Sequence, residues 1–194
     1  MSTALPTDLV ARLSAMPTAV VADALDRLGV AQGIRPVWHG ARLCGSARTV
    51  WTRSGDNKLV HEALDLAEPG EVLVVNGGGD TSRALVGELM ATRAQRRGLA
   101  GFVIDGAIRD RAGFERMAFP AFARGVSPAG PYKNGPGHLG RPVAIGGVVV
   151  APGDLLVGDD DGVVVVPAPD VPAVCLRAEE ILEIEENKRR GYGP

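Results

Sequence analysis

Cysteine is scarce in this sequence, and its histidines are far apart. Cys44 and Cys175 are the only cysteines, and neither stands in a C-x-x-C or metal-ligand spacing. Cys175 falls on the apolar face of a predicted helix, where we expect a small buried thiol. His39, His61 and His138 have no metal-ligand spacing, and we interpret each of them as structural.

Aromatic residues, excess positive charge and long apolar runs are also rare or missing. Eight aromatic residues beside 26 glycines indicate tight turns around an aliphatic core. A net charge of −2 argues against non-specific nucleic-acid binding, which needs a basic surface. No apolar run approaches the 18 residues of a membrane span, and the start of the sequence lacks a signal-peptide pattern. We therefore expect a cytoplasmic protein with no nucleic-acid or membrane partner.

Length and composition favour one folded unit. The chain has 194 residues, of which 45% are hydrophobic and 23% charged, as in ordinary soluble domains. This length is enough to bury a substantial core without disulfides or metal. Because no repeat, low-complexity tract or linker is evident, we predict a single domain over residues 1–194.

Two helices are predicted near the start of the sequence. Thr7 is expected to cap the first, which would end near Leu13. Apolar residues at helical spacing predict a second helix over residues 18–28, and Gly29 would supply its left-handed stop.

The centre of the sequence alternates strand and helix patterns. Residues 30–40 predict a loop, and residues 41–52 a strand weakened by Gly45. After a helix over 58–67, the predicted elements are a buried strand at 71–75, a helix ending at Gly98, and a strand at 101–105. This order of strand, helix and strand predicts parallel pairing with a right-handed crossover, hence an α/β fold.

The last third of the sequence has a different pattern. Residues 119–126 predict a strand interrupted by Pro120, and residues 127–140 a loop. Short apolar runs separated by turn residues then predict antiparallel strands at 143–145, 148–150, 155–157 and 163–166. An apolar stripe from Val171 to Leu182 predicts a long C-terminal helix.

Arg109 and Asp110 are the leading candidates for chemistry. They follow a predicted strand and Gly106, so we expect them at a strand's carboxyl end, where α/β sites lie. The guanidinium suits a carboxylate, and Asp offers a hard oxygen ligand to Mg²⁺ or Mn²⁺. We expect the adjacent side chains to diverge rather than neutralise each other. The alternative is a solvated salt bridge on a loop.

The segment from Gly87 to Met90 lies near the start of the central helix. Free amides there form an anion site, and a glycine lets a ligand approach the backbone. Glu88 would repel a bare anion unless a cation lies between them, which indicates a bridging metal. The alternative is a glycine for close helix packing and a favourable acidic residue in the first turn.

Three other features carry weaker hypotheses. The triple glycine at 77–79 fits neither the dinucleotide nor the P-loop pattern and indicates a flexible connection. Nothing near Lys58 or Lys133 indicates the desolvated pocket that a Schiff base requires. The acids at 159–161 favour a hairpin turn with solvated carboxylates over a calcium site.

Five segments carry a family resemblance: VADALDRLG at 21–29, EPGEVLVVNGGG at 68–79, GELMATRAQRRGLAGFVIDGAIRD at 87–110, FPAFARGVSP at 119–128 and PGDLLVGDDDGVVVVP at 152–167. They span nearly the whole chain, in order, and resemble the RraA-like proteins. This family includes regulator of ribonuclease activity A and the class II 4-hydroxy-4-methyl-2-oxoglutarate / 4-carboxy-4-hydroxy-2-oxoadipate aldolases.

The aldolases of this family have an acid, twenty residues and then Arg-Asp, which Glu88 and Arg109-Asp110 match. The family usually has Asp at the first position, and Gly113 excludes a variant pattern with an acid there. The resemblance implies that Asp110 binds Mg²⁺ or Mn²⁺ and that Glu88 and Arg109 act in catalysis. It also implies that the amides of Gly87, Glu88, Leu89 and Met90 hold the carboxylate of a 2-oxo acid. Aldol cleavage and oxaloacetate decarboxylation through a pyruvate enolate are the implied activities.

The resemblance further implies a layered fold similar to the swivelling β/β/α domain, in trimers or hexamers with sites between subunits. An acid of a neighbouring C-terminal helix then completes the site, and Glu185, or else Glu186, is the candidate. Glu185 also continues the apolar stripe of that helix. The alternative function is a non-catalytic, protein-binding regulator of a ribonuclease.

Overall fold

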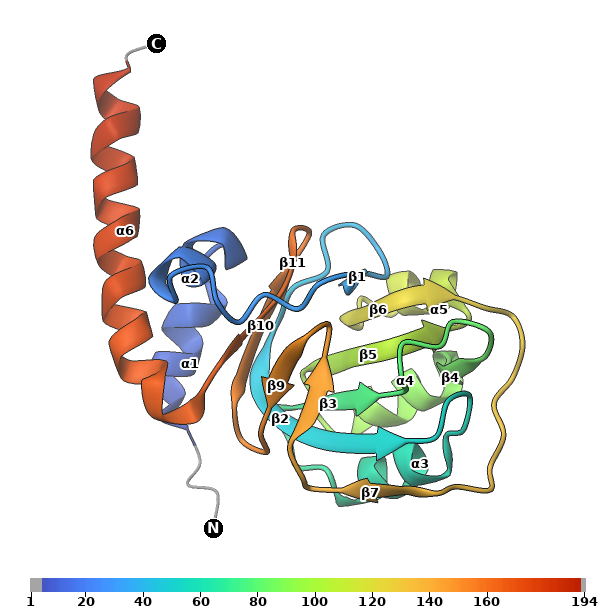
Figure 1. Cartoon of the computed structure of the whole chain (residues 1–194). Helices are drawn as coiled ribbons and strands as arrows, with labels where there is room; N and C mark the ends of the chain where they lie inside the picture. Colours follow the sequence, from blue (N-terminus) through green and yellow to red (C-terminus); the bar gives the residue numbers. More distant parts are fainter. Residues whose placement is uncertain (1–4, 193–194) are drawn as a thin grey trace.

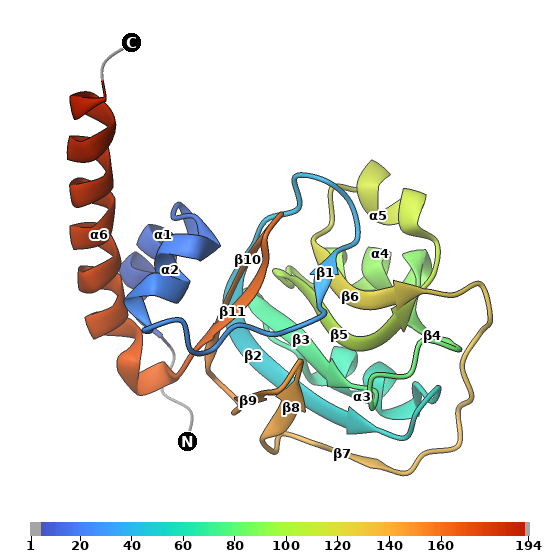
Figure 2. The ribbon, with the colours of Figure 1, turned by 45° about the horizontal axis from the view of Figure 1, so that its top comes forward.

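A nine-stranded sheet is the centre of the computed structural model, which describes residues 5–192 (Figure 1). Its order is β1-β6-β5-β3-β2-β10-β11, with β4 beside β5 and β7 beside β2. The strands are β1 (Arg35–Pro36), β2 (Leu43–Thr52), β3 (Glu71–Asn76), β4 (Ala84–Val86), β5 (Gly101–Ile108), β6 (Ala121–Val126), β7 (Gly137–Leu139), β10 (Leu155–Asp159) and β11 (Gly162–Val166). The sheet curls until β1 and β11 meet, so it is nearly closed (Figure 2).

The parallel half of the sheet confirms the predicted parallel pairing. Strands β2, β3, β5 and β6 are parallel neighbours, and β4 also runs parallel to β5. The helices α3 (Lys58–Leu66), α4 (Glu88–Arg96) and α5 (Arg111–Arg116) lie behind these strands (Figure 1). Alternate residues of β3 and β5, such as Leu73 and Ile104, pack under these helices with Phe114 of α5. Since both sheet faces are covered, continuous apolar runs form these strands.

The antiparallel half also follows the predicted pattern. β8 (Val143–Ile145) and β9 (Val148–Val150) form a separate hairpin against the other sheet face, where Val72, Val74 and Phe122 are buried. β10 and β11 form the predicted hairpin, with Asp160 and Asp161 in its turn. The carboxylates are not all solvated as expected, because Asp159 ends β10 and accepts hydrogen bonds from Thr18, and Asp160 accepts one from the Gly40 N–H. β2 runs unbroken through Gly45. A Cβ at this position would lie 2.4 Å from the carbonyl oxygen of Gly70. This glycine permits close packing.

The remaining helices cover the β10–β11 hairpin. They are α1 (Thr7–Ser14), α2 (Thr18–Ala24) and α6 (Val171–Gly191), which follows a short 3₁₀ turn (Ala168–Asp170). Cys175 is buried in this cluster, as predicted. No helix within residues 5–192 is both long enough and apolar enough to cross a membrane. The mixed α/β fold with a C-terminal helix matches the prediction from the sequence.

Several predicted boundaries in the N-terminal helices are wrong. Thr7 lies inside α1, since Pro6 occupies the cap position and no side chain caps the helix. The second helix ends at Ala24, because Asp26 and Arg27 take positive φ angles. Leu28 is consequently 71% exposed and not part of the buried stripe.

Other short elements were absent from the sequence prediction. β1 and β7 lie within segments expected to be loops, and β4 and α5 were not predicted at all. β5 continues three residues beyond the expected end at Asp105, to Ile108. β6 begins after Pro120 rather than across it. Elements of two to six residues contain too few periods to be recognised from a pattern.

Candidate active site

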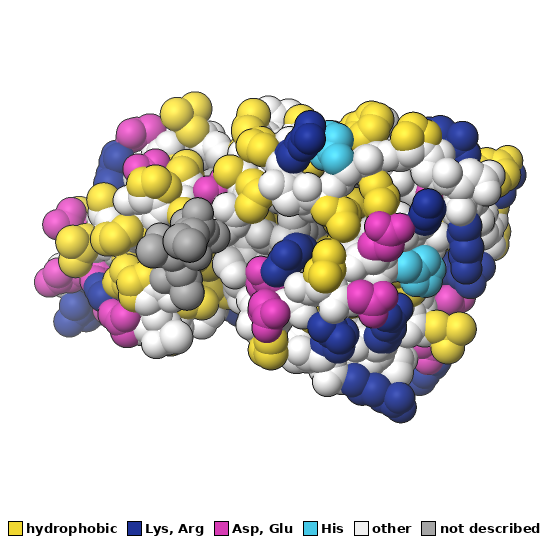
Figure 3. All heavy atoms as spheres, turned by 90° about the horizontal axis from the view of Figure 1, so that it is seen from below, with side chains coloured by type: hydrophobic (Ala, Val, Ile, Leu, Met, Phe, Trp, Pro, Cys, Tyr) yellow, Lys and Arg dark blue, Asp and Glu magenta, His cyan; other side chains and the backbone are white. Residues whose placement is uncertain are grey.

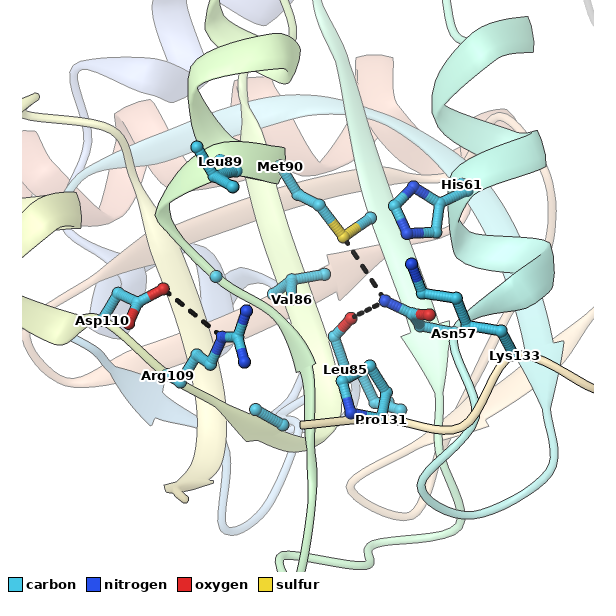
Figure 4. A pocket seen from close by; sticks show the side chains of 12 residues that line it. Asn57, His61, Leu85, Val86, Leu89, Met90, Arg109, Asp110, Pro131 and Lys133 are labelled. Carbon is cyan, nitrogen blue, oxygen red and sulfur yellow. Dashed lines mark hydrogen bonds and ion pairs between the residues drawn. The ribbon is translucent and has the colours of Figure 1, made fainter. Parts of the chain in front are cut away.

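A pocket of about 160 Å³ opens at the carboxyl ends of β4 and β5 (Figure 4). One wall is formed by the turn from β4 into α4 and by Arg109 and Asp110 after β5. The opposite wall is formed by the start of α3 and by the segment that follows β6. The lining residues are Asn57, His61, Ala84, Leu85, Val86, Gly87, Leu89, Met90, Arg109, Asp110, Pro131 and Lys133. The pocket thus contains five of the six residues predicted for the site.

Asp110 stands where β5 ends and α5 begins, in a left-handed backbone conformation with φ of 59°. Its Oδ2 accepts a hydrogen bond from the backbone N–H of Glu88 at 3.2 Å and lies 3.5 Å from Arg109 Nε. The expectation that the Arg109 and Asp110 side chains diverge is therefore wrong. Oδ1 receives no hydrogen bond from residues 5–192, so it is open to a ligand. A strained Asp held in this way is typical of functional positions.

Gly87 is required by the closeness of this pair. A Cβ at position 87 would lie 2.6 Å from Asp110 Oδ2 and 2.9 Å from Arg109 Cγ. Among the four amides expected to bind an anion, that of Glu88 donates to Asp110 and that of Met90 to the Gly87 carbonyl. The N–H groups of Gly87 and Leu89 have no acceptor among the described residues, so they remain available to a ligand.

Glu88 is the predicted site residue that lies outside the pocket lining. Its carboxylate accepts hydrogen bonds from Arg116 of α5 at 3.0 and 3.2 Å. It lies directly over Gly113, where a Cβ would be 2.5 Å from the Glu88 carboxyl carbon. The glycine that departs from the variant family pattern thus provides the space in which the longer Glu88 side chain is placed.

Three residues of the far wall were missed as site residues in the sequence. Asn57 is 3% exposed, and its amide nitrogen donates to the Leu85 carbonyl at 2.9 Å, while its Oδ1 has no partner among residues 5–192. His61 and Lys133 lie beside it (Figure 4). Burial, and then the charges of Lys133 and Arg93, lower the pKa of His61 below its usual range.

The spacing of Asn57 and His61 was the feature of the sequence that could have identified these two residues as part of a site. Residues four apart lie on one helix face, so both side chains point from the start of α3 toward one place. Lys133 gave no such signal, because it stands in a segment rich in Gly and Pro. Both His61 and Lys133 thus line a pocket that the sequence did not indicate at either position, and Lys133 is exposed rather than desolvated.

Buried Asp56 holds the segment that carries Lys133. Its carboxylate accepts backbone N–H groups of Asn134 at 2.6 Å, Gly135 at 3.0 Å and Lys58 at 3.0 Å. Burial opposes the charged form, but these hydrogen bonds and Arg53 outweigh it and lower the pKa of Asp56. The carboxylate therefore ties α3 to the segment after β6.

The other candidates lie away from the pocket. The glycines at 77–79 form a turn in which the N–H groups of Gly77 and Gly79 donate to the Asp105 carbonyl and that of Gly78 to Asn76 Oδ1. His39 is on the surface beside Asp160, and His138 stacks on Trp51. Glu185 pairs with Arg189 on α6, at the end of the molecule opposite α3, α4 and α5 (Figure 1).

The donors at Asp110 fit a magnesium-like cation. No three His, Cys, Asp or Glu side chains converge within residues 5–192, so the chain itself offers one carboxylate. Mg²⁺ is commonly bound by one or two carboxylates while keeping several waters. The free Oδ1 of Asp110 on an open pocket meets that requirement.

The comparisons with known proteins decide the family. A family model described as RraA-like, Aldolase/RraA, matches residues 18–165. The chain belongs to the RraA-like family. A relative from Halalkalibacterium halodurans, provisionally named 4-hydroxy-4-methyl-2-oxoglutarate aldolase, is 39% identical and covers 94% of this chain and 88% of its own length. Names of relatives thus support an RraA-family aldolase.

Solved structures of RraA-like proteins share the whole fold. An uncharacterized protein from Pseudomonas syringae pv. tomato has a TM-score of 0.90 at 29% identity, covering 100% of this chain and 93% of that one. RraAS2 from Streptomyces coelicolor has a TM-score of 0.87 at 29% identity, covering 96% and 98%. The latter is described as an unusual member of the RNase ES inhibitor RraA family, so the fold accommodates both kinds of function.

Proposed function

We propose that this protein is a divalent-metal-dependent pyruvate aldolase. Its substrates would be 4-hydroxy-4-methyl-2-oxoglutarate or 4-carboxy-4-hydroxy-2-oxoadipate, and it would also decarboxylate oxaloacetate. The observation that carries the proposal is the cluster of Gly87, Arg109 and Asp110 on one wall of the pocket. A regulator that acts only by binding another protein does not require a cation, a carboxylate and free amides converging in a pocket.

The residues of this wall would have different roles toward a bound 2-oxo acid. The free N–H groups of Gly87 and Leu89 are placed to bind the substrate carboxylate, as helix N-termini do. Arg109 lies beside Asp110 and presents its remaining donors to the 2-oxo oxygen, where negative charge develops. Asp110 would hold Mg²⁺ or Mn²⁺ through its free Oδ1. When bound, such an ion polarises the carbonyl as a Lewis acid.

The proposed cleavage balances without a redox partner. The 4-hydroxyl loses its proton and becomes a carbonyl as the bond between C3 and C4 breaks. The electron pair moves onto C3 and the 2-oxo oxygen, which Arg109 stabilises. Water takes up the hydroxyl proton and returns one to C3, which gives pyruvate. Oxaloacetate would follow the same course, with CO₂ as the second fragment.

We further propose that the site is completed in a homotrimer or hexamer by Glu185, or else Glu186, of an adjacent subunit. Glu88 is held by Arg116 and contributes no carboxylate to the pocket lining, so a water-binding acid from outside the chain has a place to act. Since α6 lies at the opposite end of the molecule, its acids reach a pocket only in another subunit (Figure 1).

The test is a coupled pyruvate assay with metal removal. We expect pyruvate release from both a 4-hydroxy-2-oxo acid and oxaloacetate, loss of it with EDTA, and recovery with Mg²⁺ or Mn²⁺. Asp110→Ala should lose activity by about 100-fold or more, while Asp170→Ala, at an exposed position, should not. Full activity of Asp110→Ala would exclude the proposal.

The alternative, a regulator that binds a ribonuclease, is supported by the described role of the Streptomyces neighbour's family. It predicts tight binding to an endoribonuclease by a protein with no lyase activity. Binding that persists in Asp110→Ala, measured together with an inactive wild type, would favour it.

A further inference from the structure

The two opposite walls of the pocket carry different kinds of polar side chain. The first wall carries Arg109 and Asp110, which the proposed function uses for the 2-oxo acid group. The second wall carries Lys133, His61 and Asn57, for which that function has no role so far (Figure 4). Asp110 is the only acid among the lining residues, and it belongs to the first wall.

Lys133 is a cation without a counter-ion. No carboxylate of residues 5–192 lies within 4.0 Å of its ammonium group, whereas Arg53, Arg93, Arg109 and Arg116 each pair with one. After burial, the positive charge of Lys133 is one cause of the lowered pKa of the partly buried His61 imidazole. An unpaired ammonium in a pocket has its attraction available to an incoming anion.

The backbone around Lys133 is fixed on both sides. Tyr132 donates its N–H to the Gly55 carbonyl at 2.7 Å and accepts from the Asn57 N–H at 3.0 Å. Asn134 and Gly135, on the other side, donate to the buried Asp56 carboxylate. The guanidinium of Arg83 lies 4.2 Å from the centre of the Tyr132 ring. Lys133 is thus an exposed side chain on an anchored backbone, which lowers the entropic cost of binding.

Asn57 supplies a second, independent indication of a ligand. Its Nδ2 is committed to Leu85 and Met90, so its Oδ1 is left as a buried acceptor without a donor among the described residues. Buried polar atoms nearly always have a partner, and an orphan that lines a pocket is a place for a ligand donor. A hydroxyl group next to a carboxylate offers such a donor beside an anion.

We propose that Lys133 is the specificity-determining residue that binds the second carboxylate of the substrate, on C4. Asn57 Oδ1 accepts the adjacent 4-hydroxyl, and the anchored segment at 132–135 fixes their spacing. The inference rests on the proposed aldolase function and deepens it. It names the residue that would recognise the C4 carboxylate, which both substrates of the proposed function carry and their uncharged counterparts lack.

A pair of substrates that differ only at C4 tests this assignment. In 4-hydroxy-4-methyl-2-oxoglutarate C4 carries a carboxylate, and in 4-hydroxy-4-methyl-2-oxopentanoate a methyl group replaces it. We expect Lys133→Met to lower kcat/KM for the first roughly 30-fold, and to change kcat/KM for the second less than about twofold. Lys133→Arg should keep most of the preference because it keeps the charge. Lys58→Met, at an exposed lysine outside the pocket, is the matched control.

The possible results distinguish a failure of the role assigned to Lys133 from a failure of the proposed aldolase function. An equal loss for both substrates, or no loss for either, overturns the role of Lys133, as does a wild type that prefers the methyl compound. Covalent trapping of pyruvate on Lys133 by borohydride would also overturn it, because the lysine would then be a nucleophile. A wild type that cleaves neither substrate would instead remove the proposed function itself.

Discussion

At the scale of single residues, the geometry of the site depends on the absence of a side chain at Gly87. Its φ of −150° is open to any residue, so backbone freedom does not explain the glycine. The explanation is space, since an added Cβ would stand only 2.6 Å from Asp110 Oδ2 and 2.9 Å from Arg109 Cγ. The same space lets a ligand approach the free amides of the helix start.

Replacing Gly87 by Ala should therefore separate activity from stability. The added methyl group pushes the Asp110 carboxylate and the Arg109 side chain out of place. We expect turnover to fall about 100-fold, because small misplacements of reacting groups cost that much. Thermal unfolding should change little, since both displaced side chains are about 43% exposed.

Gly191→Ala is the control, because a Cβ there meets nothing within 4 Å. Unchanged turnover of Gly87→Ala would show that the close approach has no catalytic role.

The residues of the first wall were predictable and those of the second were not. Gly87 stands at the start of α4, and Arg109 and Asp110 follow β5, the strand that comes next, so local patterns indicated each of these positions. Lys133 meets Asn57 only because a segment after β6 crosses back over the start of α3. Contacts that depend on such a crossing leave no period in the sequence.

At the scale of elements, the carboxylate of Asp56 joins helix α3 to the segment that follows β6. Asp56 is fully buried and holds the start of α3 against the segment at 134–135. That segment has almost no regular structure of its own, so its path depends on these hydrogen bonds.

Asp56→Ala should therefore destabilise the fold by about 3 kcal/mol, since three N–H groups lose their acceptor in a buried place. Urea unfolding measures this. The control Asp80→Ala removes an exposed turn carboxylate that bonds Ser82, and we expect less than about 1 kcal/mol from it. Equal effects of the two changes would contradict the assigned role of Asp56.

Strands and long helices were predicted well because their patterns extend over many residues. The runs at 71–75 and 163–166 are buried on both faces, and their apolar character is continuous. By contrast, α2 ends four residues early through positive φ angles at Asp26 and Arg27, which neither residue type signals.

At the scale of the whole molecule, α6 extends beyond the helices that it packs on. Its first half is buried against α1 and α2, but Leu176 and Ile184 are 58% and 53% exposed. On the face in Figure 3, hydrophobic side chains gather among charged ones at the end formed by α1 and α6. Such a helix face suits contact with another copy of the chain.

Ile184→Asp should weaken the proposed trimer or hexamer. A charge at this apolar position opposes burial between subunits, so the mass in solution should fall toward that of one chain. Turnover should fall with it, because the pocket loses the neighbour's acid. Light scattering coupled to size-exclusion chromatography measures the mass, and Glu183→Gln, at an exposed position of α6, is the control. An Ile184→Asp protein with unchanged mass would exclude α6 from the interface.

The division of the pocket into two walls has a consequence for how new substrates are acquired. The first wall is framed by β4, β5 and α4, whereas the charged group of the second wall, Lys133, stands on a short segment between Gly130 and Gly135 that faces the start of α3. Variation confined to that short segment exchanges the recognised group at C4 while bond cleavage stays intact. A library at residues 131–134, with Asp56 kept, should therefore yield aldolases of altered substrate range from a single scaffold.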